Sequence, residues 1–551
     1  MGNIIDELGL SLLKEKTEEC NALRNRHVSS SRDGVIETIN LLSSCWRTGK
    51  PMITPLVTSN GYEDPVFKYI YLPAELRNIF HTPLVQRMNY INQLSFAYFA
   101  YPMANHSRLA HSLGTSNLIR KALRRMFAQG KVYTKNGIVD YFFDDETQKR
   151  VICTAQLVAL LHDIGHGPFG HALDKYVCFS LFEEKKIKKG YKHLDKYYTP
   201  KYVRDCLKHL IGEIKYYGDN CLVPDNVIEI LEMDKSSLDG LNNLIGQLID
   251  SALDVDRIDY ILRDSYTSGL TQGLINVEAL LHNMVIFKDD DGIYNLAYNV
   301  NAMPHIEHLL YARDIMFLYC YEHGLKVCGD RLIEKALINF VQEYDLIDHF
   351  EDILLLTDQQ LVTLILSYAT EGMDCFKIIK NLIRGLEFEE LLTIRYRKTQ
   401  ENNKEINGEI PEKTIEKERK EAPARKNDRI KEFAKKTTYG DLREAYYDLP
   451  ETWERDIAAK ASIERWKIHI VLASHETIET KEESAYIVVP NGKGFDYKQI
   501  REVPNLMSNR NEVSSIRSAR NRVRVFIYSG CTKEEKENAK EFAFKYLTEE
   551  R

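Results

Sequence analysis

The segment at residues 161–171 constrains this chain more than any other part of it. It reads Leu-His-Asp-Ile-Gly-His-Gly-Pro-Phe-Gly-His and directly follows an apolar run with helical spacing. Three histidines and one aspartate lie within ten of its residues, in a chain with 16 histidines among 551 residues. Glycine and proline after His162 and Asp163 break the helix. We therefore expect a helix that ends in a polar turn, with His166 and His171 directed toward the same cavity.

His162 and Asp163 offer the donor atoms of a divalent metal site. A hard or borderline divalent cation binds imidazole nitrogen and carboxylate oxygen at about 2 Å. Two such ligands do not hold a catalytic metal, so we expect more elsewhere. Upstream, His111 stands three residues after Arg108, about one helical turn away. Downstream, residues 253–260 place carboxylates among apolar residues, where a buried carboxylate is costly unless it is paired or bound to metal.

These motifs together resemble the HD superfamily, whose signature is H…HD…D. The longer strings are similar to the deoxynucleoside triphosphate (dNTP) triphosphohydrolases, especially the catalytic core of the SAM-and-HD-domain type. The similar stretches are residues 82–87, 108–114, 162–171, 254–264, 313–323 and 524–547. The HD dipeptide alone is only moderately specific, because the superfamily hydrolyses many phosphoesters. The combined set is much more specific.

The resemblance implies a metal site and a reaction. The metal ligands would be His111, His162, Asp163 and Asp256, and the ion would be Mn, Fe, Mg or Zn. It would polarise the α-phosphate and lower the pKa of a bound water. Attack at the α-phosphorus would release the deoxynucleoside and intact triphosphate.

The resemblance also assigns groups around the reacting centre. His166, Asp174 and His193 match family positions that line it. His171 matches a proposed proton donor to the leaving 5′ oxygen. Histidine suits that role because its pKa lies near working pH.

Triphosphate binding would use three cations and one hydroxyl. The matching positions are Arg108, Arg257, Arg313 and Tyr260. Arg257 stands where the SAM-and-HD-domain type has a lysine. The replacement keeps the positive charge but exchanges the compact ammonium group of lysine for the planar, forked guanidinium group of arginine.

Sugar recognition is implied at four further positions. Gln93 and Asp264 match the pair that binds the 3′-hydroxyl. Leu94 and Tyr321 match residues that crowd C2′ and so exclude ribonucleotides. The sequence therefore predicts a preference for deoxyribonucleotides.

Three positions depart from the pattern. Asn89 and His81 stand where the SAM-and-HD-domain type has an Arg and an Asp that bind an activating guanine nucleotide. That mode of activation is not expected here. Glu322 replaces a Gln near the base, which predicts a different base preference. No SAM domain is expected ahead of the core.

Some of these residues also have a purely structural interpretation. Arg108 and Arg313 could form salt bridges between helices, and Tyr321 could be a core residue. Asp254 and Asp259 are interpreted as carboxylates that cap a helix or pair with arginine, and they are not included in the predicted site.

The apolar spacing predicts a mostly α protein with an HD-domain helical core and a smaller α+β C-terminal lobe. Residues 401–436 contain 20 charged residues among 36, too polar to form a core. The predicted regions are an N-terminal helical extension, the HD catalytic domain, a charged linker or solvated helix, and the α+β lobe, at residues 1–60, 61–396, 397–437 and 438–551.

The C-terminal region is expected to hold strands and a closing helix. Runs rich in β-branched and aromatic residues occur at residues 466–472, 485–489 and 523–528. The residues after them have helical spacing, with Ala539 and Ala543 on one face.

Composition indicates a protein of a reducing compartment. The net charge of −7 gives no overall basic field, so nucleic-acid or membrane binding is not expected as the main role. Its ten cysteines are scattered singly, which is typical of free thiols. Neither a signal peptide nor an apolar run long enough to span a bilayer is expected, and a cytoplasmic location is predicted.

Three functions remain open from the sequence. The first is dNTP hydrolysis, which Gln93, Asp264, Arg313 and Tyr321 favour. The second is an HD phosphohydrolase acting on a signalling nucleotide or a nucleoside monophosphate. The third is a nucleotide-gated binding protein with little turnover, which the complete set of metal positions disfavours. The resemblance also implies a homo-oligomer (dimer, tetramer or hexamer), with a regulatory nucleotide between subunits and the C-terminal lobe as a contact.

Overall fold

Helices make up most of this protein, as the sequence predicts. The computed structural model describes residues 31–49, 61–174, 193–232, 238, 240–395, 449–473, 485–492, 494–502 and 522–548. The strands within these ranges are short, and they form one six-stranded sheet, one three-stranded sheet and two hairpins. The predicted class, a mostly α protein with a smaller strand-containing lobe, is confirmed.

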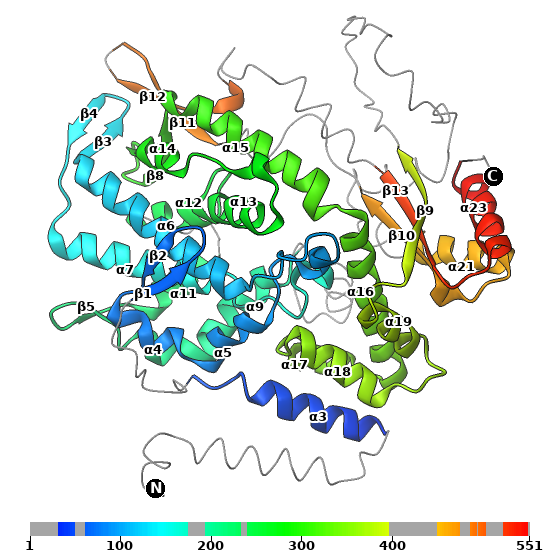
Figure 1. Ribbon diagram of the computed structural model, residues 1–551. Coiled ribbons are helices and arrows are strands. Elements are labelled where there is room, and N and C mark those ends of the chain that lie inside the picture. Colours follow the sequence, from blue (N-terminus) through cyan, green and yellow to red (C-terminus); the bar gives the residue numbers. More distant parts are fainter. Residues whose placement is uncertain are drawn as a thin grey trace, which may run out of the picture.

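The helices form one body, in which α6 and α7 pack against each other (Figure 1). Its shorter helices are α4 (Arg77–Phe80), α5 (Pro83–Gln86), α10 (Lys208–Ile211), α14 (Val277–His282) and α17 (Phe350–Leu354). Its longer helices are α3 (Arg32–Ser44), α6 (Arg108–Gln129), α7 (Asp145–Leu161), α9 (Asp195–Tyr202), α11 (Pro224–Glu232), α12 (Gly240–Ile249), α13 (Val255–Ser268), α15 (Met303–Met316), α16 (Gly324–Tyr344), α18 (Asp358–Tyr368) and α19 (Asp374–Ile383).

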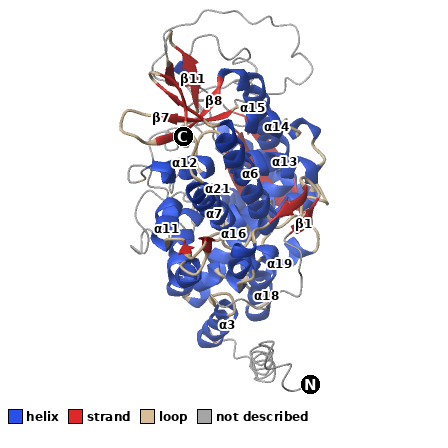
Figure 2. Ribbon diagram, turned by 90° about the vertical axis from the view of Figure 1, so that its left-hand side faces the viewer, coloured by secondary structure: helices blue, strands red, loops and turns tan. Residues whose placement is uncertain are grey.

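Strands gather at one end of this body and at its C-terminal side (Figures 1 and 2). The six-stranded sheet has the order β12-β11-β8-β7-β3-β4, and the three-stranded sheet has the order β10-β13-β9. The strands are β1 (Gly61–Asp64), β2 (Lys68–Tyr71), β3 (Lys131–Thr134), β4 (Gly137–Asp140), β5 (Lys215–Tyr217), β6 (Asn220–Cys221), β7 (Met284–Lys288), β8 (Tyr294–Asn299), β9 (Phe388–Arg395), β10 (Ile468–Ala473), β11 (Tyr486–Pro490), β12 (Phe495–Gln499) and β13 (Arg522–Tyr528).

Local capping sets where the helices that carry the site begin. Ser107, Asp144 and Asp254 each accept a backbone N–H three residues ahead, at the starts of α6, α7 and α13. Such side-chain caps satisfy donors that a helix leaves open at its first turn. Gly130 and Gly269 end α6 and α13 in left-handed conformations, with φ of 60° and 77°.

The C-terminal lobe has a core of its own. Helices α21 (Leu449–Ala461) and α23 (Lys533–Thr548) pack on the three-stranded sheet through Trp453, Ile457 and Val525. Strands β10, β11 and β13 and helix α23 confirm the elements predicted at the end of the chain.

Strand pairing crosses the predicted domain boundaries. β9 lies within residues 61–396 but pairs with β13. β11 lies within residues 438–551 but pairs in parallel with β8. The boundaries near residues 396 and 437 fall outside the described residues, as do residues 1–30 with the first expected helix, so the division into four regions stays a prediction.

No described helix has the length and apolar character needed to cross a membrane. Eight cysteines lie in the described ranges, and all of them are free thiols.

Candidate active site

The four predicted metal ligands come together from three helices. His111 lies in the first turn of α6, His162 and Asp163 follow the last residue of α7, and Asp256 lies in the first turn of α13. Asp256 Oδ1 lies 2.9 Å from His111 Nε2 and 3.4 Å from His162 Nε2. Asp163 lies 3.8 Å from His111 Nε2 through Oδ2 and 3.4 Å from His162 Nε2 through Oδ1.

These residues fit a divalent cation. Two imidazole nitrogens and two carboxylates converge, a donor set that suits borderline divalent metals. His162 Nε2 is buried and has no hydrogen-bond partner among the described residues. A buried polar atom of this kind calls for a partner, and a metal ion would provide one. His111, His162 and Asp163 could therefore hold a metal together with Asp256.

Charge in the cluster also favours a cation. Burial alone would lower the pKa of His111, but hydrogen bonds to Asp256 and Asp259 raise it to about 10. The two histidines hold the pKa of Asp256 well below its usual range despite its burial. The site thus stabilises positive charge, which a bound metal would supply in place of the proton.

Hydrogen bonds from the outer side fix both metal-facing histidines. His111 Nδ1–H donates to Asp259 Oδ2 at 2.8 Å, and His162 Nδ1–H donates to the carbonyl oxygen of Ala159 at 2.8 Å. Arg263 holds Asp259 in turn, at 2.9 and 3.0 Å. Such bonds leave Nε2 as the metal-facing nitrogen and orient the ring.

Asp259 was therefore missed as a functional residue. The sequence interpretation, pairing with arginine, is correct, but the same carboxylate also positions His111. Its position three residues after Asp256, on the same helix α13, is the feature of the sequence that could have identified it. Asp254 does cap α13, and its Oδ2 lies 3.4 Å from Arg257 Nε.

The four residues predicted to line the reacting centre also meet. His166 Nε2 and His171 Nε2 lie 3.4 Å apart, as expected from the glycine-rich turn. Asp174 Oδ2 lies 2.6 Å from His171 Nδ1 and 3.0 Å from His193 Nδ1. Asp195, which the sequence did not single out, places Oδ1 3.6 Å from His166 Nε2.

Arg87 fixes the turn that carries these histidines. Its guanidinium is fully buried and donates to the carbonyl oxygens of Ile164 and His166, at 2.9 and 2.6 Å. It also donates to the carbonyl oxygens of Leu354 and Leu356, so it ties the turn to the end of α17. Arg87 is a second residue of the site region to which the sequence assigned no role.

One of the predicted phosphate-binding residues, Arg108, contacts the predicted metal ligands directly. Arg108 is buried, and its Nη1 lies 2.7 Å from Asp163 Oδ2. A Cβ atom at Gly170, where φ is 52°, would lie 2.3 Å from Arg108 Nη2, so this turn favours glycine. Burial raises the pKa of Tyr260, and the neighbouring charges of Arg257 and Arg313 oppose that rise. Both arginines thus flank Tyr260.

Three of the four predicted sugar-binding residues form a second cluster, and Gln93 contacts its surroundings through the backbone of His106. Tyr321 donates its hydroxyl to Asp264 Oδ2 at 2.8 Å. Leu94 packs in one small apolar cluster with Tyr321, Met316 and Cys320. The ring centroids of Tyr260 and Tyr321 lie 6.3 Å apart, which links this cluster to the phosphate side.

A π-helical turn at Phe317–Tyr321 directs Tyr321 into this cluster. Such turns occur often at functional sites, because the extra residue re-aims a side chain. Glu322 follows the turn and contacts the C-terminal lobe. Its Oε2 lies 3.3 Å from Arg522 Nη2, and its carbonyl oxygen accepts from Arg524 at 2.6 Å.

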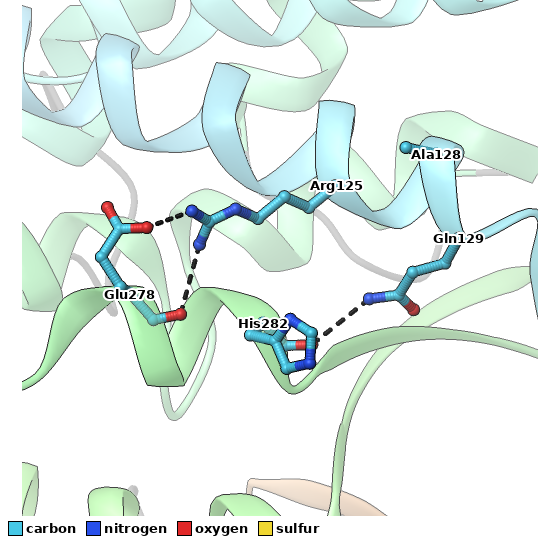
Figure 3. Close-up of a pocket in the computed structure, with 5 residues that line it drawn as sticks. All are labelled: Arg125, Ala128, Gln129, Glu278 and His282. Carbon is cyan, nitrogen blue, oxygen red and sulfur yellow. Dashed lines mark hydrogen bonds and ion pairs between the residues drawn. The ribbon is translucent and has the colours of Figure 1, made fainter.

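A separate surface pocket of about 480 Å³ lies between α6 and α14 (Figure 3). Arg125 contacts the carboxylate and the carbonyl oxygen of Glu278, and Gln129 donates to the carbonyl oxygen of His282 at 3.2 Å. None of the predicted site residues lines this pocket.

Comparisons with known proteins find similarity in the region that carries these residues. Residues 108–264 match the HD domain, a range that includes all four predicted metal ligands. A phosphohydrolase from Bacteroides thetaiotaomicron has a similar structure, with a TM-score of 0.55 and 20% identity over 85% of this chain and 99% of that one. The chain therefore contains an HD domain and shares the fold of that phosphohydrolase.

Several curated relatives match over about half of their length, and one matches over a much shorter part. An uncharacterized protein of Methanocaldococcus jannaschii is 29% identical over 326 residues, which cover 58% of each chain. The uncharacterized protein YwfO of Bacillus subtilis is 27% identical over 285 residues, 52% of this chain and 56% of that protein. The deoxynucleoside triphosphate triphosphohydrolase SAMHD1 of Gallus gallus is 35% identical over 113 residues, 20% of this chain and 16% of that protein.

Proposed function

We propose that this protein hydrolyses dNTPs to deoxynucleoside and inorganic triphosphate in a metal-dependent reaction. The observation that carries the proposal is the adjacency of two clusters. His111, His162, Asp163 and Asp256 converge as metal ligands, and the Asp264–Tyr321 pair follows along the same helix, α13, as a sugar site. The similarity to deoxynucleoside triphosphate triphosphohydrolases of Gallus gallus and Bos taurus supports the same assignment.

Each cluster has a distinct task in this proposal. When bound, the metal polarises the α-phosphate and activates a water molecule. Arg108, Arg257 and Arg313 neutralise the triphosphate, which holds the α-phosphorus near the metal ligands. When the substrate binds, Arg108 gives up its hydrogen bond to Asp163 and donates to the phosphate oxygens instead.

Proton transfer to the leaving group falls to His171. Its side chain is 58% exposed, so an incoming substrate can reach it. Its Nδ1–H is held by Asp174, which leaves Nε2 to carry the proton to the 5′ oxygen. His193 donates to the same carboxylate oxygen and limits the movement of Asp174.

The test is a product assay with the metal-loaded protein. Each dNTP and NTP is incubated with Mn²⁺ or Mg²⁺, and nucleoside, triphosphate, monophosphate and pyrophosphate are separated. Deoxynucleoside and triphosphate in equal amounts are expected. Stoichiometric pyrophosphate would assign the protein to a different reaction, as would turnover of a nucleoside monophosphate alone.

The variant Asp256→Ala tests the metal assignment in the same assay. Loss of one of four ligands should abolish turnover and reduce bound metal, measured by mass spectrometry of the purified protein. Asp225→Ala, at an exposed position of α11, serves as the matched control, because Asp225 is not a predicted ligand. Full activity of a folded Asp256→Ala protein would overturn the assignment.

We also propose that the protein works as a homo-oligomer regulated by a nucleotide between subunits. Size-exclusion chromatography with light scattering, with and without dNTP, measures this directly. A monomer under both conditions would contradict it.

A further inference from the structure

His106 is a histidine beside the sugar-binding residues to which the sequence assigned no role. Its Nε2 lies 2.9 Å from Asp264 Oδ1, and its side chain is 10% exposed. Its carbonyl oxygen accepts a hydrogen bond from the backbone N–H of Gln93 at 2.9 Å, so the two residues are neighbours. His106 also precedes Arg108 by two residues, which places sugar-facing and phosphate-facing groups at the same end of α6.

Asp264 has a polar neighbour on each carboxylate oxygen. Oδ1 pairs with His106, and Oδ2 accepts the hydroxyl of Tyr321 at 2.8 Å. The residue is 2% exposed, so these two bonds supply most of its hydrogen bonding. Because a carboxylate accepts and does not donate, the His106 nitrogen that faces it must carry the proton.

Two polar atoms next to this pair have no hydrogen-bond partner within the described ranges. They are His106 Nδ1 and Gln93 Oε1, and both are shielded from solvent. A buried polar atom without a partner costs free energy, so nearly all such atoms in folded proteins are paired. Two of them on neighbouring residues indicate that a ligand group completes the bonding.

The chemistry of the two atoms selects that group. Gln93 Oε1 accepts only, and the neutral His106 ring accepts at Nδ1 when Nε2–H faces Asp264. A phosphate or a carbonyl offers no donor, and a phosphate would also meet the charge of Asp264. A hydroxyl can donate to one of the acceptors, and sugars carry such groups.

We propose that His106 is a specificity-determining residue whose Nδ1 accepts a hydrogen bond from a hydroxyl of the substrate sugar, beside Gln93. This proposal rests on the proposed function, because it names a further contact in the same substrate pocket. His106 then has two roles at once: one ring nitrogen contacts the sugar, and the other holds Asp264.

Two conservative variants separate these roles. In His106→Asn the amide reaches the position of Nδ1, so the sugar contact is retained and the bond to Asp264 is lost. In His106→Gln the amide reaches the position of Nε2, so the bond to Asp264 is retained and the sugar contact is lost. His106→Phe removes both. His308→Phe, at an exposed position of α15, is the matched control.

The experiment compares dATP with 2′,3′-dideoxyATP, which lacks the 3′-hydroxyl, using the full metal-loaded protein. The wild-type kcat/KM should favour dATP by at least about a hundredfold, because the dideoxy sugar leaves buried acceptors unpaired. His106→Phe should lower this ratio about tenfold or more, because kcat/KM for dATP falls while kcat/KM for dideoxyATP changes little. His106→Asn should retain more of the ratio than His106→Gln, and His308→Phe should retain all of it.

Two results would overturn the inference. In the first, His106→Phe lowers both substrates equally, which indicates a structural role. In the second, His106→Gln retains more discrimination than His106→Asn, which indicates that the ring only positions Asp264. If the wild type hydrolyses neither substrate, the proposed function fails. In that case, calorimetry on the same proteins measures the dissociation constants of the two nucleotides and so tests the role of His106. If their ratio in His106→Phe equals that of the wild type, the role is overturned. It is also overturned if neither nucleotide binds.

Discussion

Each metal-facing histidine uses its second ring nitrogen for a hydrogen bond that decides which nitrogen faces the cavity. For His162 the partner is the backbone carbonyl oxygen of Ala159, which a change of the Ala159 side chain does not remove. For His111 the partner is the side chain of Asp259, which Arg263 holds through two bonds. The orientation of His111 therefore depends on a residue that does not touch the metal.

Asp259→Asn should weaken metal binding without removing a ligand. The amide keeps the shape but loses the charge that supports His111, and loss of such a partner lowers metal affinity about 10–100-fold. Metal titration of the purified variant measures the change, and circular dichroism checks that it is folded. Asp345→Asn, at an exposed residue after α16, should leave the affinity unchanged. Wild-type metal affinity in Asp259→Asn would mean that the ring orients without this carboxylate.

Leu94→Ala combined with Tyr321→Ala should relax discrimination against ribonucleotides. Both side chains belong to one apolar cluster beside Asp264, so their removal opens space where a 2′-hydroxyl would otherwise clash. Turnover of NTPs should rise relative to that of dNTPs, measured as the ratio of kcat/KM for ATP and dATP. If the wild-type enzyme already hydrolyses ATP as fast as dATP, these residues do not exclude ribonucleotides.

Helix α13 carries more of the predicted site residues than any other described helix or strand. It carries Asp256 of the proposed metal ligands, Tyr260 of the proposed phosphate site and Asp264 of the proposed sugar site, at intervals of four residues. This spacing puts all three on one helical face. Asp259 and Arg263 repeat the interval beside them and connect α13 to α6 through His111.

Helices α16 and α21 join the C-terminal lobe to the helical body through buried charges. Glu454 is fully buried, contacts Lys335 and lies 3.5 Å from Arg331. It also accepts the backbone N–H of Ile470 at 2.7 Å. Burial lowers the pKa of Lys335 to about 8 although Glu454 opposes the shift, so this ammonium depends on its carboxylate partner.

Glu454→Ala should destabilise the attachment of the lobe. Removing one partner of a buried ion pair costs about 3–5 kcal/mol, because the remaining charge stays buried. The midpoint of denaturant unfolding should fall, measured by tryptophan fluorescence, since Trp453 lies in the core of the lobe. Arg455→Ala, at the exposed neighbouring position, should change the free energy of unfolding by no more than about 0.5 kcal/mol. Equal midpoints for Glu454→Ala and wild type would show that this network does not stabilise the lobe.

At the scale of the whole molecule, the C-terminal lobe contacts the helical body next to the proposed substrate pocket. Arg522 and Arg524 on β13 hold Glu322, the residue directly after Tyr321. β11 and β12 also extend the six-stranded sheet of the helical body, as Figure 1 shows. The lobe therefore contacts the residue that directly follows Tyr321.

GTP should not be an obligatory activator of this protein. Asn89 and His81 replace the Arg and Asp expected to bind guanine, and Asn89 instead contacts Gln86 at 3.1 Å. Each lost charge-assisted hydrogen bond is worth about 1.5–3 kcal/mol, so two losses weaken binding at least about a hundredfold. GTP titration into an assay with a single dNTP measures this. Strong, saturable activation that depends on GTP alone would contradict the prediction.

The sequence by itself determined the helical class and the strands and closing helix of the lobe. These follow from local patterns: helical spacing before His162, the glycines after it, and alternating β-branched residues in β13. The pairing of β9 with β13 and of β8 with β11 was decided only by tertiary structure, because strand pairing joins residues far apart in the chain. The same holds for Asp259, Arg87 and His106, whose side chains look ordinary until the fold places them against His111, the catalytic turn and Asp264.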